Sequence, residues 1–429
     1  MRSKEIFQWV RVLLFATVLV GGCVLGFLLH LRPVVSDAEG RELTKFPAFT
    51  WESFLSGAYT SQINLWYADT FPGREAFLEL SGDLKSLYGV RHQAFGGYGG
   101  DVDTIGGGGN FDWNSPPPPA NPRPDTDSET VDGYYVEGDT CWQLYYYKRD
   151  LTDRYCRAVV QAALDLNGIA TVYGMVVPTA CCYGLTAEKL AELGASDGMA
   201  AIEHIYGAIE AYCPQAGVEV PVITLPVHEI LGEHYGEYIY FRTDHHWTGK
   251  GAWYASRCFL DAVGRSYPPL EAYETFTYES FLGSLYRHTQ NENLKNSPDT
   301  LVAYRSPTVS ELLTASKGVY TTHPLIHTEI TSSNKYLCFC AGDHAYYEAH
   351  NETIGDGSSI LIIKESYGNA FIPMIVDSYE HVYAVDYRFW EGDLISFVQE
   401  WGIDTVLFLN NLMATGDEYT VGCLENLVK

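Results

Sequence analysis

Basic residues are scarce in this sequence. Its 429 residues include 27 lysines and arginines against 54 aspartates and glutamates, so the formal net charge at pH 7 is −27. Such a surface repels the phosphates of nucleic acids and offers no basic patch for docking on anionic lipid. Nucleic-acid binding and electrostatic attachment to a membrane surface are therefore excluded as main functions.

Two further patterns are missing. No pair of cysteines has C-x-x-C spacing, which argues against a zinc ribbon or a thioredoxin-like redox site. No segment repeats with a period of about 20 to 50 residues, so a solenoid is not indicated. Cysteine itself occurs ten times, and the odd number beyond residue 31 leaves at least one thiol over even where disulfides are permitted. These are Cys141, Cys156, Cys181, Cys182, Cys213, Cys258, Cys338, Cys340 and Cys423.

A long apolar run stands near the N-terminus. Residues 12–31, VLLFATVLVGGCVLGFLLHL, are interrupted only by Thr17 and His30 and follow three basic residues. About 20 apolar residues span a bilayer as a helix, and the positively charged flank stays in the cytoplasm. We therefore predict a single membrane anchor over 12–31, with the rest of the chain outside the cytoplasm. A cleaved signal peptide and a lipoprotein processed at Cys23 are the alternatives.

Composition divides the chain into four parts. Residues 1–33 form the cytoplasmic tail and anchor, and residues 34–94 carry apolar residues at helical spacing. Residues 95–132 contain GGYGGDVDTIGGGG and NSPPPPANPRPDTDSE, which cannot bury a core, so we predict a linker or disordered loop. Residues 133–429 are expected to form the main domain.

From residue 133 the sequence alternates between helix and strand signals. Runs without polar alternation, such as SSILIIK, indicate strands buried on both faces of a parallel sheet, with helices covering them. We therefore predict an α/β fold with a mainly parallel sheet, whose ligands bind beyond the carboxyl ends of the strands. The expected strands are 171–178, 218–225, 358–364, 381–386 and 405–410. The expected helices are 151–167, 197–212 closed by Pro214, one capped by Thr248, one from Ser366 to about Tyr379, and 391–401.

Ser366 is the first candidate for chemistry. It follows a predicted strand and opens a helix in KESYGNAF, where the helix N-terminus supplies N–H donors for an oxyanion. A serine nucleophile needs a base, and His246, with Asp244 two residues earlier in TDHHWT, supplies the base and an orienting carboxylate. Ser366, His246 and Asp244 are therefore candidates for a catalytic triad, with His245 as a neighbour. The alternative for Ser366 is a helix N-cap.

Two other interpretations of the DHHW segment stay open. In one it is structural, with Trp247 in the core, Asp244 bonded to backbone and Thr248 capping a helix. In the other it binds a metal, although adjacent histidines point apart and metal sites more often use i, i+2 or i, i+4 spacing. Our prediction is that neither a metal nor a cofactor is needed. The ligands in the metal interpretation would come from Asp244, His245, His246, Asp343, His344 and His350.

The segment TDHHWTGKGA (243–252) resembles the signature of the bacterial DHHW proteins and is similar to the T-D-x-H-W-T-x-x-G-A segment of the alginate O-acetyltransferases. The resemblance covers 34–94 and 133–429, including FPAFTWESFLSGAYTSQINLWYADTFPGREAF, VVPTA, GDH and VDYRFW. It implies an SGNH-hydrolase-like, flavodoxin-like three-layer fold in a permuted order, because the D-x-H segment precedes the serine. Glu365 departs from the family's usual aspartate before that serine.

The resemblance also implies an activity, which is O-acetyl transfer outside the membrane. Ser366 would form an acyl-enzyme, His246 would act as base, and Asp244 would orient it. The acetyl group would pass to a cell-surface or exopolysaccharide, and a multi-span membrane acyltransferase would supply it. A carbohydrate esterase would use the same triad, and a non-catalytic glycan-binding or assembly protein would keep the fold, so both stay open.

The same resemblance suggests which groups would donate hydrogen bonds to the oxyanion. The backbone N–H of Ser366 is one, and SGNH-like folds place an asparagine after a later strand, where Asn410 and Asn411 stand in FLNN. Arg388 is a candidate for binding substrate. Turn formation is the alternative role of the two asparagines.

Overall fold

The computed structural model describes residues 35–36, 41–42, 45–51, 54, 58–71, 105, 133–316 and 318–428. The predicted anchor at 12–31, and all of the predicted linker except residue 105, lie outside these ranges. Within them, no helix combines the length and the apolar character needed to cross a membrane. The chain divides into two compact units, 1–91 with 332–334, and 92–331 with 335–429.

The described part of the first unit contains one helix, α3 (Ala58–Asp69), and a short antiparallel pair of strands. These strands are β1 (Val35–Ser36) and β2 (Arg41–Glu42). Helix α3 lies within the segment 34–94 that we predict to be helical, and most of the remaining segment lies outside the described residues.

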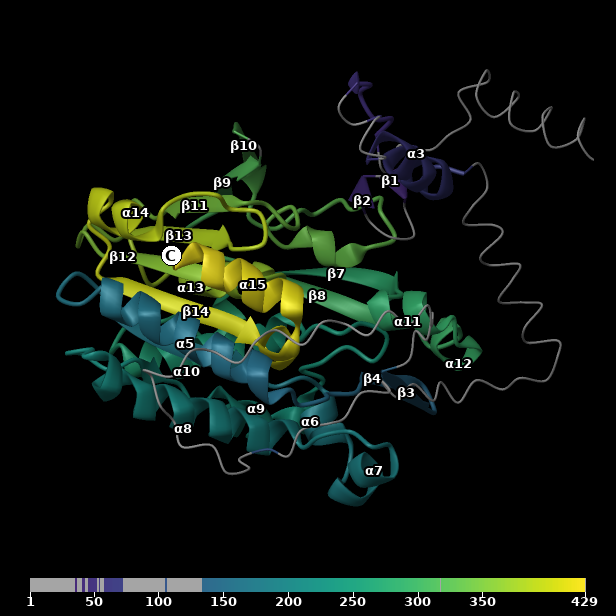
Figure 1. Cartoon of the computed structure of the whole chain (residues 1–429), viewed down its shortest axis with the longest axis horizontal. Coiled ribbons are helices and arrows are strands. Elements are labelled where there is room, and N and C mark those ends of the chain that lie inside the picture. The colour runs from purple at the N-terminus through teal and green to yellow at the C-terminus, as the bar shows by residue number, and fades with distance from the viewer. Residues whose placement is uncertain are drawn as a thin grey trace, which may run out of the picture. The chain divides into compact units, whose positions relative to one another are not determined.

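The second unit is built on an eight-stranded sheet in the order β10-β9-β11-β13-β12-β14-β5-β6 (Figure 1). The five strands from β13 to β6 run parallel, as predicted, and β11, β9 and β10 extend the sheet in antiparallel fashion. The parallel strands are β5 (Thr171–Val177), β6 (Ile223–Thr224), β12 (Ser359–Lys364), β13 (His381–Asp386) and β14 (Thr405–Asn411). The antiparallel ones are β9 (Glu311–Ser316), β10 (Val319–Pro324) and β11 (Tyr346–His350).

Helices cover both faces of this sheet. Every residue of β12 is buried, and its side chains alternate between two cores. Ile360 and Ile362 belong to the first core, and Leu361 and Ile363 belong to the second. This alternation explains why the strand reads as a continuous apolar run. The first core is closed by α9 (Val227–Glu233), α10 (Gly249–Ala262) and α13 (Tyr367–Ile375). The second is closed by α5 (Arg149–Asp165), α8 (Gly198–Ala216), α14 (Leu394–Glu400) and α15 (Glu418–Leu427).

The order of the parallel strands has a consequence for where a ligand binds. If the chain is numbered from β12 through β13, β14 and β5 to β6, the spatial order reads 2-1-3-4-5, which is the flavodoxin-like order. In such sheets ligands bind outside the carboxyl ends of strands 1 and 3, which correspond to β12 and β14 here. Ser366 follows β12 and Asn411 ends β14.

Several predicted boundaries differ from the structure. Helix α13 ends at Ile375 and not near Tyr379, and α14 begins at Leu394 and not at residue 391. Two further boundaries differ because of prolines. Helix α8 runs through Pro214 and ends at Gly217, whose φ of 83° is left-handed. A proline in the last turn gives up only its own N–H bond, so the glycine rather than the proline ends the helix. The expected strand 218–225 shrinks to the two residues of β6, because Pro221 lacks the N–H that a longer edge strand would use.

Smaller elements surround the sheet. Two hairpin-like pairs are β3 (Tyr134–Glu137) with β4 (Thr140–Gln143), and β7 (Glu274–Phe281) with β8 (Asp299–Arg305). Short helices are α6 (Cys181–Gly184), α7 (Ala187–Glu192), α11 (Ser284–Thr289) and α12 (Glu292–Lys295). Every cysteine of the described chain is a free thiol.

Candidate active site

Ser366 lies at the junction between β12 and α13, at the carboxyl edge of the sheet. Ser366 stands at the N-cap position of α13, as the alternative interpretation expects, but its side chain makes no capping hydrogen bond. Instead the carboxylate of Glu365 accepts the N–H of Tyr367 at 3.1 Å and so satisfies the helix start. The hydroxyl of Ser366 makes a long contact of 3.3 Å with the same Glu365 carboxylate and a shorter one with His246, described below.

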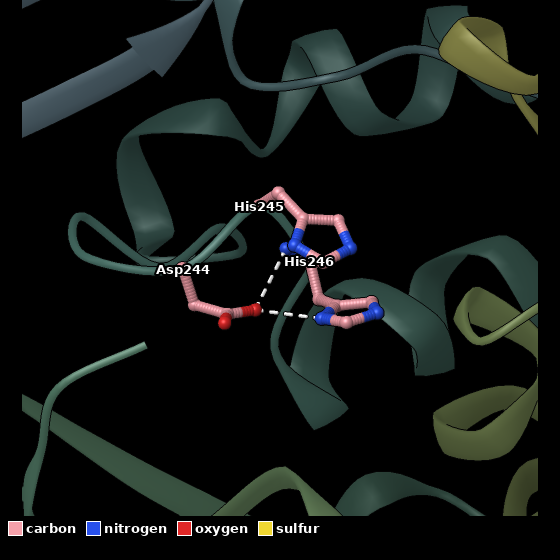
Figure 2. Close-up of side chains that lie close together, drawn as sticks. All are labelled: Asp244, His245 and His246. Carbon is pink, nitrogen blue, oxygen red and sulfur yellow. Dashed lines mark hydrogen bonds and ion pairs between the residues drawn. The ribbon is translucent and has the colours of Figure 1, made fainter. Parts of the chain in front are cut away.

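The loop before α10 brings a carboxylate and an imidazole together. Oδ1 of Asp244 accepts hydrogen bonds from the backbone N–H of His246 at 3.0 Å and from its Nδ1 at 2.6 Å (Figure 2). Oδ2 of Asp244 accepts the N–H of Ser284 at 2.7 Å. Both oxygens are used, so the carboxylate is fixed in position and direction.

The second ring nitrogen of His246 completes a chain of contacts. Its Nε2 lies 2.8 Å from the hydroxyl of Ser366. Because Nδ1 faces a carboxylate and carries the proton, Nε2 is the acceptor for the serine hydroxyl. The ring of Tyr336 stacks on the imidazole, with centroids 3.8 Å apart and planes inclined by 11°. The structure thus brings Asp244, His246 and Ser366 into one hydrogen-bonded line.

Trp247 and Thr248 connect this loop to the rest of the fold. The buried indole of Trp247 donates from its N–H to the carbonyl of Tyr367 at 3.1 Å, directly after the serine. The hydroxyl of Tyr367 donates back to the carbonyl of His245. Thr248 caps α10 by accepting the N–H of Gly251, as predicted. The structural interpretation of the DHHW segment is therefore correct for these residues, and they also position the histidine.

Burial and the neighbouring side chains together shift the pKa values of Asp244 and His245. Burial alone would raise the pKa of Asp244, but the contacts with His246 outweigh it and hold that pKa well below its usual range. Asp244 therefore stays ionised at neutral pH. Burial, reinforced by His246, lowers the pKa of His245 to about 3, so this ring stays neutral. Nδ1 of His245 contacts the hydroxyl of Ser284 at 2.5 Å and has no contact with Ser366 in the described chain.

The metal interpretation fits these residues less well. Ligand atoms of Asp244, His245 and His246 do lie within 4.8 Å of one another. Both nitrogens of His246 and Nδ1 of His245 are already hydrogen-bonded, however, which favours a proton relay over an ion. The more distant ligands of that hypothesis lie elsewhere: Asp343 pairs with Arg388, His344 contacts Ser316, and His350 ends β11.

The predicted oxyanion donors differ in their positions. Asn410 is fully buried, with its oxygen accepting from Tyr155 at 3.1 Å and its nitrogen donating to Tyr387 at 3.2 Å. The structure therefore does not bring Asn410 to the serine. Asn411 faces the site, and its Oδ1 accepts the N–H groups of two residues in the following turn, as the turn alternative expects.

Arg388 is held by carboxylates. Its guanidinium donates to both oxygens of Asp386, at 2.8 and 2.6 Å, and to Asp343 at 2.9 Å. Burial would lower the pKa of Arg388, but Asp386 outweighs it and keeps the group charged. Only 19% of the side chain is exposed, at the border of the groove beside Ser366. Arg388 mainly neutralises the buried Asp386 and also pairs with Asp343, whose side chain is 34% exposed.

Sequence reasoning missed Lys364 and the second role of Glu365. Lys364 is fully buried under the serine, where Nζ donates to Tyr347 at 2.8 Å and to Asn369 at 2.5 Å. Its burial lowers its pKa. Oε1 of Glu365 accepts the N–H of Asn411 at 2.9 Å and so ties β14 to β12. In the sequence, the only indication of a role for Lys364 and Glu365 is their charge at the end of an otherwise apolar strand.

A groove of about 530 Å³ opens over Ser366. It is lined by the segment around β3 and β4 with the loop that follows, by His288 of α11, and by the turn after β14. We call it the Ser366 groove. Its side chains combine aromatic rings with a few polar groups, as ligand sites commonly do. They include Tyr134, Tyr145, Tyr146, Lys148, His288 and Asn411.

Comparisons with known proteins found several solved structures that match this chain. A DHHW protein from Eubacterium siraeum is 28% identical, with a TM-score of 0.60 over 69% of this chain and 96% of that one. Bacillus cereus PatB1 is 15% identical, with a TM-score of 0.55 over 67% of this chain and 98% of PatB1, and it shares the fold. The O-acetyltransferase domain of Pseudomonas putida AlgJ matches with a TM-score of 0.39 and 16% identity, over 68% of this chain and 99% of that one.

No curated protein matches the chain. The family model described as "DHHW protein" matches residues 39–111 and 120–385, which is more than half of the sequence. The chain belongs to the DHHW protein family.

Proposed function

We propose that this protein is an O-acyltransferase that moves an acetyl group to a glycan hydroxyl through an acyl-enzyme on Ser366. The observation that carries the proposal is the line of contacts from Asp244 through His246 to Ser366, with 2.6 Å and 2.8 Å between the paired atoms. A carboxylate, a correctly oriented imidazole and a hydroxyl in this order make up an activated nucleophile.

The reaction has two balanced halves. Oγ of Ser366 attacks the carbonyl carbon of an acetyl ester while Nε2 of His246 takes its proton, and that proton then goes to the departing alcohol. The acyl-enzyme is attacked by an acceptor hydroxyl, whose proton passes to Nε2 and then back to Oγ. Asp244 stabilises the imidazolium in both halves without itself taking the proton.

Two groups are suited to hold the oxyanion. The backbone N–H of Ser366 donates no hydrogen bond within the described residues and lies at the positive end of α13. The amide of Asn411 has its oxygen fixed by two backbone N–H groups, which leaves Nδ2 as the donor on the groove side. We assign these two donors, and not Asn410, to the oxyanion.

The Ser366 groove is suited to a chain of sugars, since it is open and lined by several tyrosines. Flat rings such as these stack on sugar faces. We propose a cell-surface or exported polysaccharide as acceptor. The apolar run at 12–31 would keep the enzyme at the outer face of the cell membrane, beside a multi-span acyltransferase that delivers the acetyl group.

The test uses the full-length chain in mild detergent, with 4-nitrophenyl acetate as donor and an unacetylated oligosaccharide as acceptor. We expect Ser366→Ala to lower nitrophenol release by roughly 10³-fold or more, because the nucleophile is gone. Ser396→Ala, at an exposed serine of α14, is the matched control and keeps full activity. Acetylated oligosaccharide is quantified by mass spectrometry.

Each result has a defined meaning. Acetyl recovered on the sugar supports transfer, whereas acetate alone would make the protein an esterase and reject the transferase proposal. Release that survives Ser366→Ala, or no release by the wild type with any acetyl donor, would reject the nucleophile. PatB1 has been solved with a sulfonyl adduct. A sulfonyl fluoride should likewise label this chain at Ser366, and a label elsewhere would count against the assignment.

A further inference from the structure

A second group of histidines lies at the other end of the sheet. His350, the last residue of β11, pairs directly across from His381, the first residue of β13. Their rings stack with centroids 4.6 Å apart and planes inclined by 10°. Glu380 precedes His381, and its Oε1 lies 3.8 Å from Nε2 of His350 and 3.6 Å from Nε2 of His381.

The backbone holds this group in place. The N–H of Glu380 donates to the hydroxyl of Ser358 at 3.1 Å, and its carbonyl accepts the N–H of Asn351 at 2.8 Å. Oε2 of Glu380 accepts the N–H of Gly357 at 2.6 Å, which leaves Oε1 directed at the two rings. An outer hydrogen bond of this kind is what orients a ligating carboxylate in metal sites.

The separations are close to those of a metal site, and because the two rings are stacked they would also have to turn so that both Nε2 atoms face one ion. All three ligand atoms lie within 4.8 Å of one another. In a tetrahedral complex with bonds near 2 Å the ligand atoms stand roughly 3.3 Å apart. The two nitrogen–oxygen distances are therefore within about 0.5 Å of that value, a shift that side-chain rotation can supply.

We propose that His350, Glu380 and His381 bind a divalent first-row transition metal of the zinc class. Two imidazoles and one carboxylate form a ligand set that zinc uses, and the exposure of His350 (47% of its side chain) leaves a fourth position for water. Calcium and magnesium, which prefer oxygen ligands, are excluded by the two nitrogens.

The position of the site assigns it a structural role. β13 runs from His381 to Asp386, about 16 Å at the usual rise, so the metal would lie at the amino end of the parallel strands, opposite Ser366. It would join the end of the antiparallel strand β11 to the parallel strand β13. The metal would thus stabilise the fold and take no part in the acyl transfer proposed above.

The experiment measures zinc binding to the full-length chain by calorimetry, together with the melting temperature Tm. We expect one zinc per chain, and a rise in Tm of roughly 5 °C at a zinc concentration 100 times Kd. His350→Ala and Glu380→Gln should each weaken binding by at least about tenfold and abolish the rise in Tm. Magnesium at the same concentration should leave Tm unchanged.

The matched control is His323→Ala, in a different group of histidines whose rings lie 5.4 and 5.6 Å apart. It should bind zinc as the wild type does. Zinc binding that persists in both His350→Ala and Glu380→Gln, or that is lost only in His323→Ala or His246→Ala, would overturn the assignment. So would the absence of zinc binding by the wild type.

Discussion

His246 can exchange a proton through only one of its two ring nitrogens. Its Nδ1 is held 2.6 Å from Asp244, whose other oxygen is held in turn by the N–H of Ser284. Only Nε2 is left to exchange a proton, and it faces Ser366. The stacked ring of Tyr336 prevents the imidazole from tilting. An imidazole held by Asp244 and by the ring of Tyr336 would need little reorganisation as the base of the proposed acyl transfer, which is the condition for efficient proton transfer.

The lowered pKa of His245 predicts how the free energy of unfolding depends on pH. The unfolded chain binds a proton on this ring below about pH 6.5, whereas burial lowers the pKa of His245 in the folded chain to about 3. Between these values the unfolded state binds more protons, so stability falls as the pH decreases, by up to about 1.4 kcal/mol per pH unit. His245→Gln lacks this proton uptake and should lose less stability between pH 6.5 and pH 5.

The measurement is urea unfolding of both proteins at pH 7.5, 6.5, 5.5 and 5.0. The free energy of unfolding of the wild type should fall more steeply below pH 6.5 than that of the variant, whatever their difference at pH 7.5. Parallel curves would show that His245 is not held neutral by the fold.

The turn before α11 leaves room for the carboxylate of Asp244 only because Gly283 has no side chain. A Cβ atom built on Gly283 would lie 2.1 Å from Cβ and 2.4 Å from Oδ2 of Asp244. Any side chain at this position must therefore push Asp244 away from Ser284 and His246. The glycine is needed for this close approach, since its backbone conformation (φ −86°) is open to all residues.

Gly283→Ala should accordingly reduce kcat by roughly 100-fold, because a displacement of about 1 Å in a positioning group has an effect of this size. The chain should still fold, as judged by circular dichroism, because the clash is confined to one turn. Gly207→Ala, where the new Cβ meets no atom within 4 Å, is the matched control and should leave kcat unchanged. An unchanged kcat in Gly283→Ala would mean that the position of Asp244 has no effect on the rate.

At the scale of elements, the sequence predicts what depends on local pattern and misses what depends on distant partners. β12 and β13 were expected within one residue of their observed bounds, because buried parallel strands are apolar throughout. Gly283 and Ser284 carry no local signal of their contact with Asp244, about 40 residues away. Asn410 and Asn411 are alike in sequence, and only the alternation of β14 decides that one faces the core and the other the groove.

For the whole molecule, the site follows from the strand order more than from the order of the chain. Asp244 and His246 come before β12 in the sequence, yet their loop lies at the carboxyl edge of the neighbouring strands β12 and β14, where His246 reaches Ser366. The proposed nucleophile after β12 and the proposed donor after β14 lie at the two strands of that switch point. The segments of the site can therefore occur in a permuted order along the chain, because the sheet edge alone brings them together.

The last prediction concerns the attachment of the chain to the membrane. The apolar run 12–31 should hold the protein in the membrane fraction through washes with high salt and carbonate, because about 20 apolar residues are enough to span a bilayer. Replacing Leu19 and Leu25 by arginine costs about 3 kcal/mol for each charge near the bilayer centre, so the double variant should move to the soluble fraction. Cys23→Ala is the control and should stay in the membrane, because a spanning helix does not need the thiol. Release of Cys23→Ala would instead identify a lipid-modified cysteine, and a soluble wild type would remove the membrane from the proposed function.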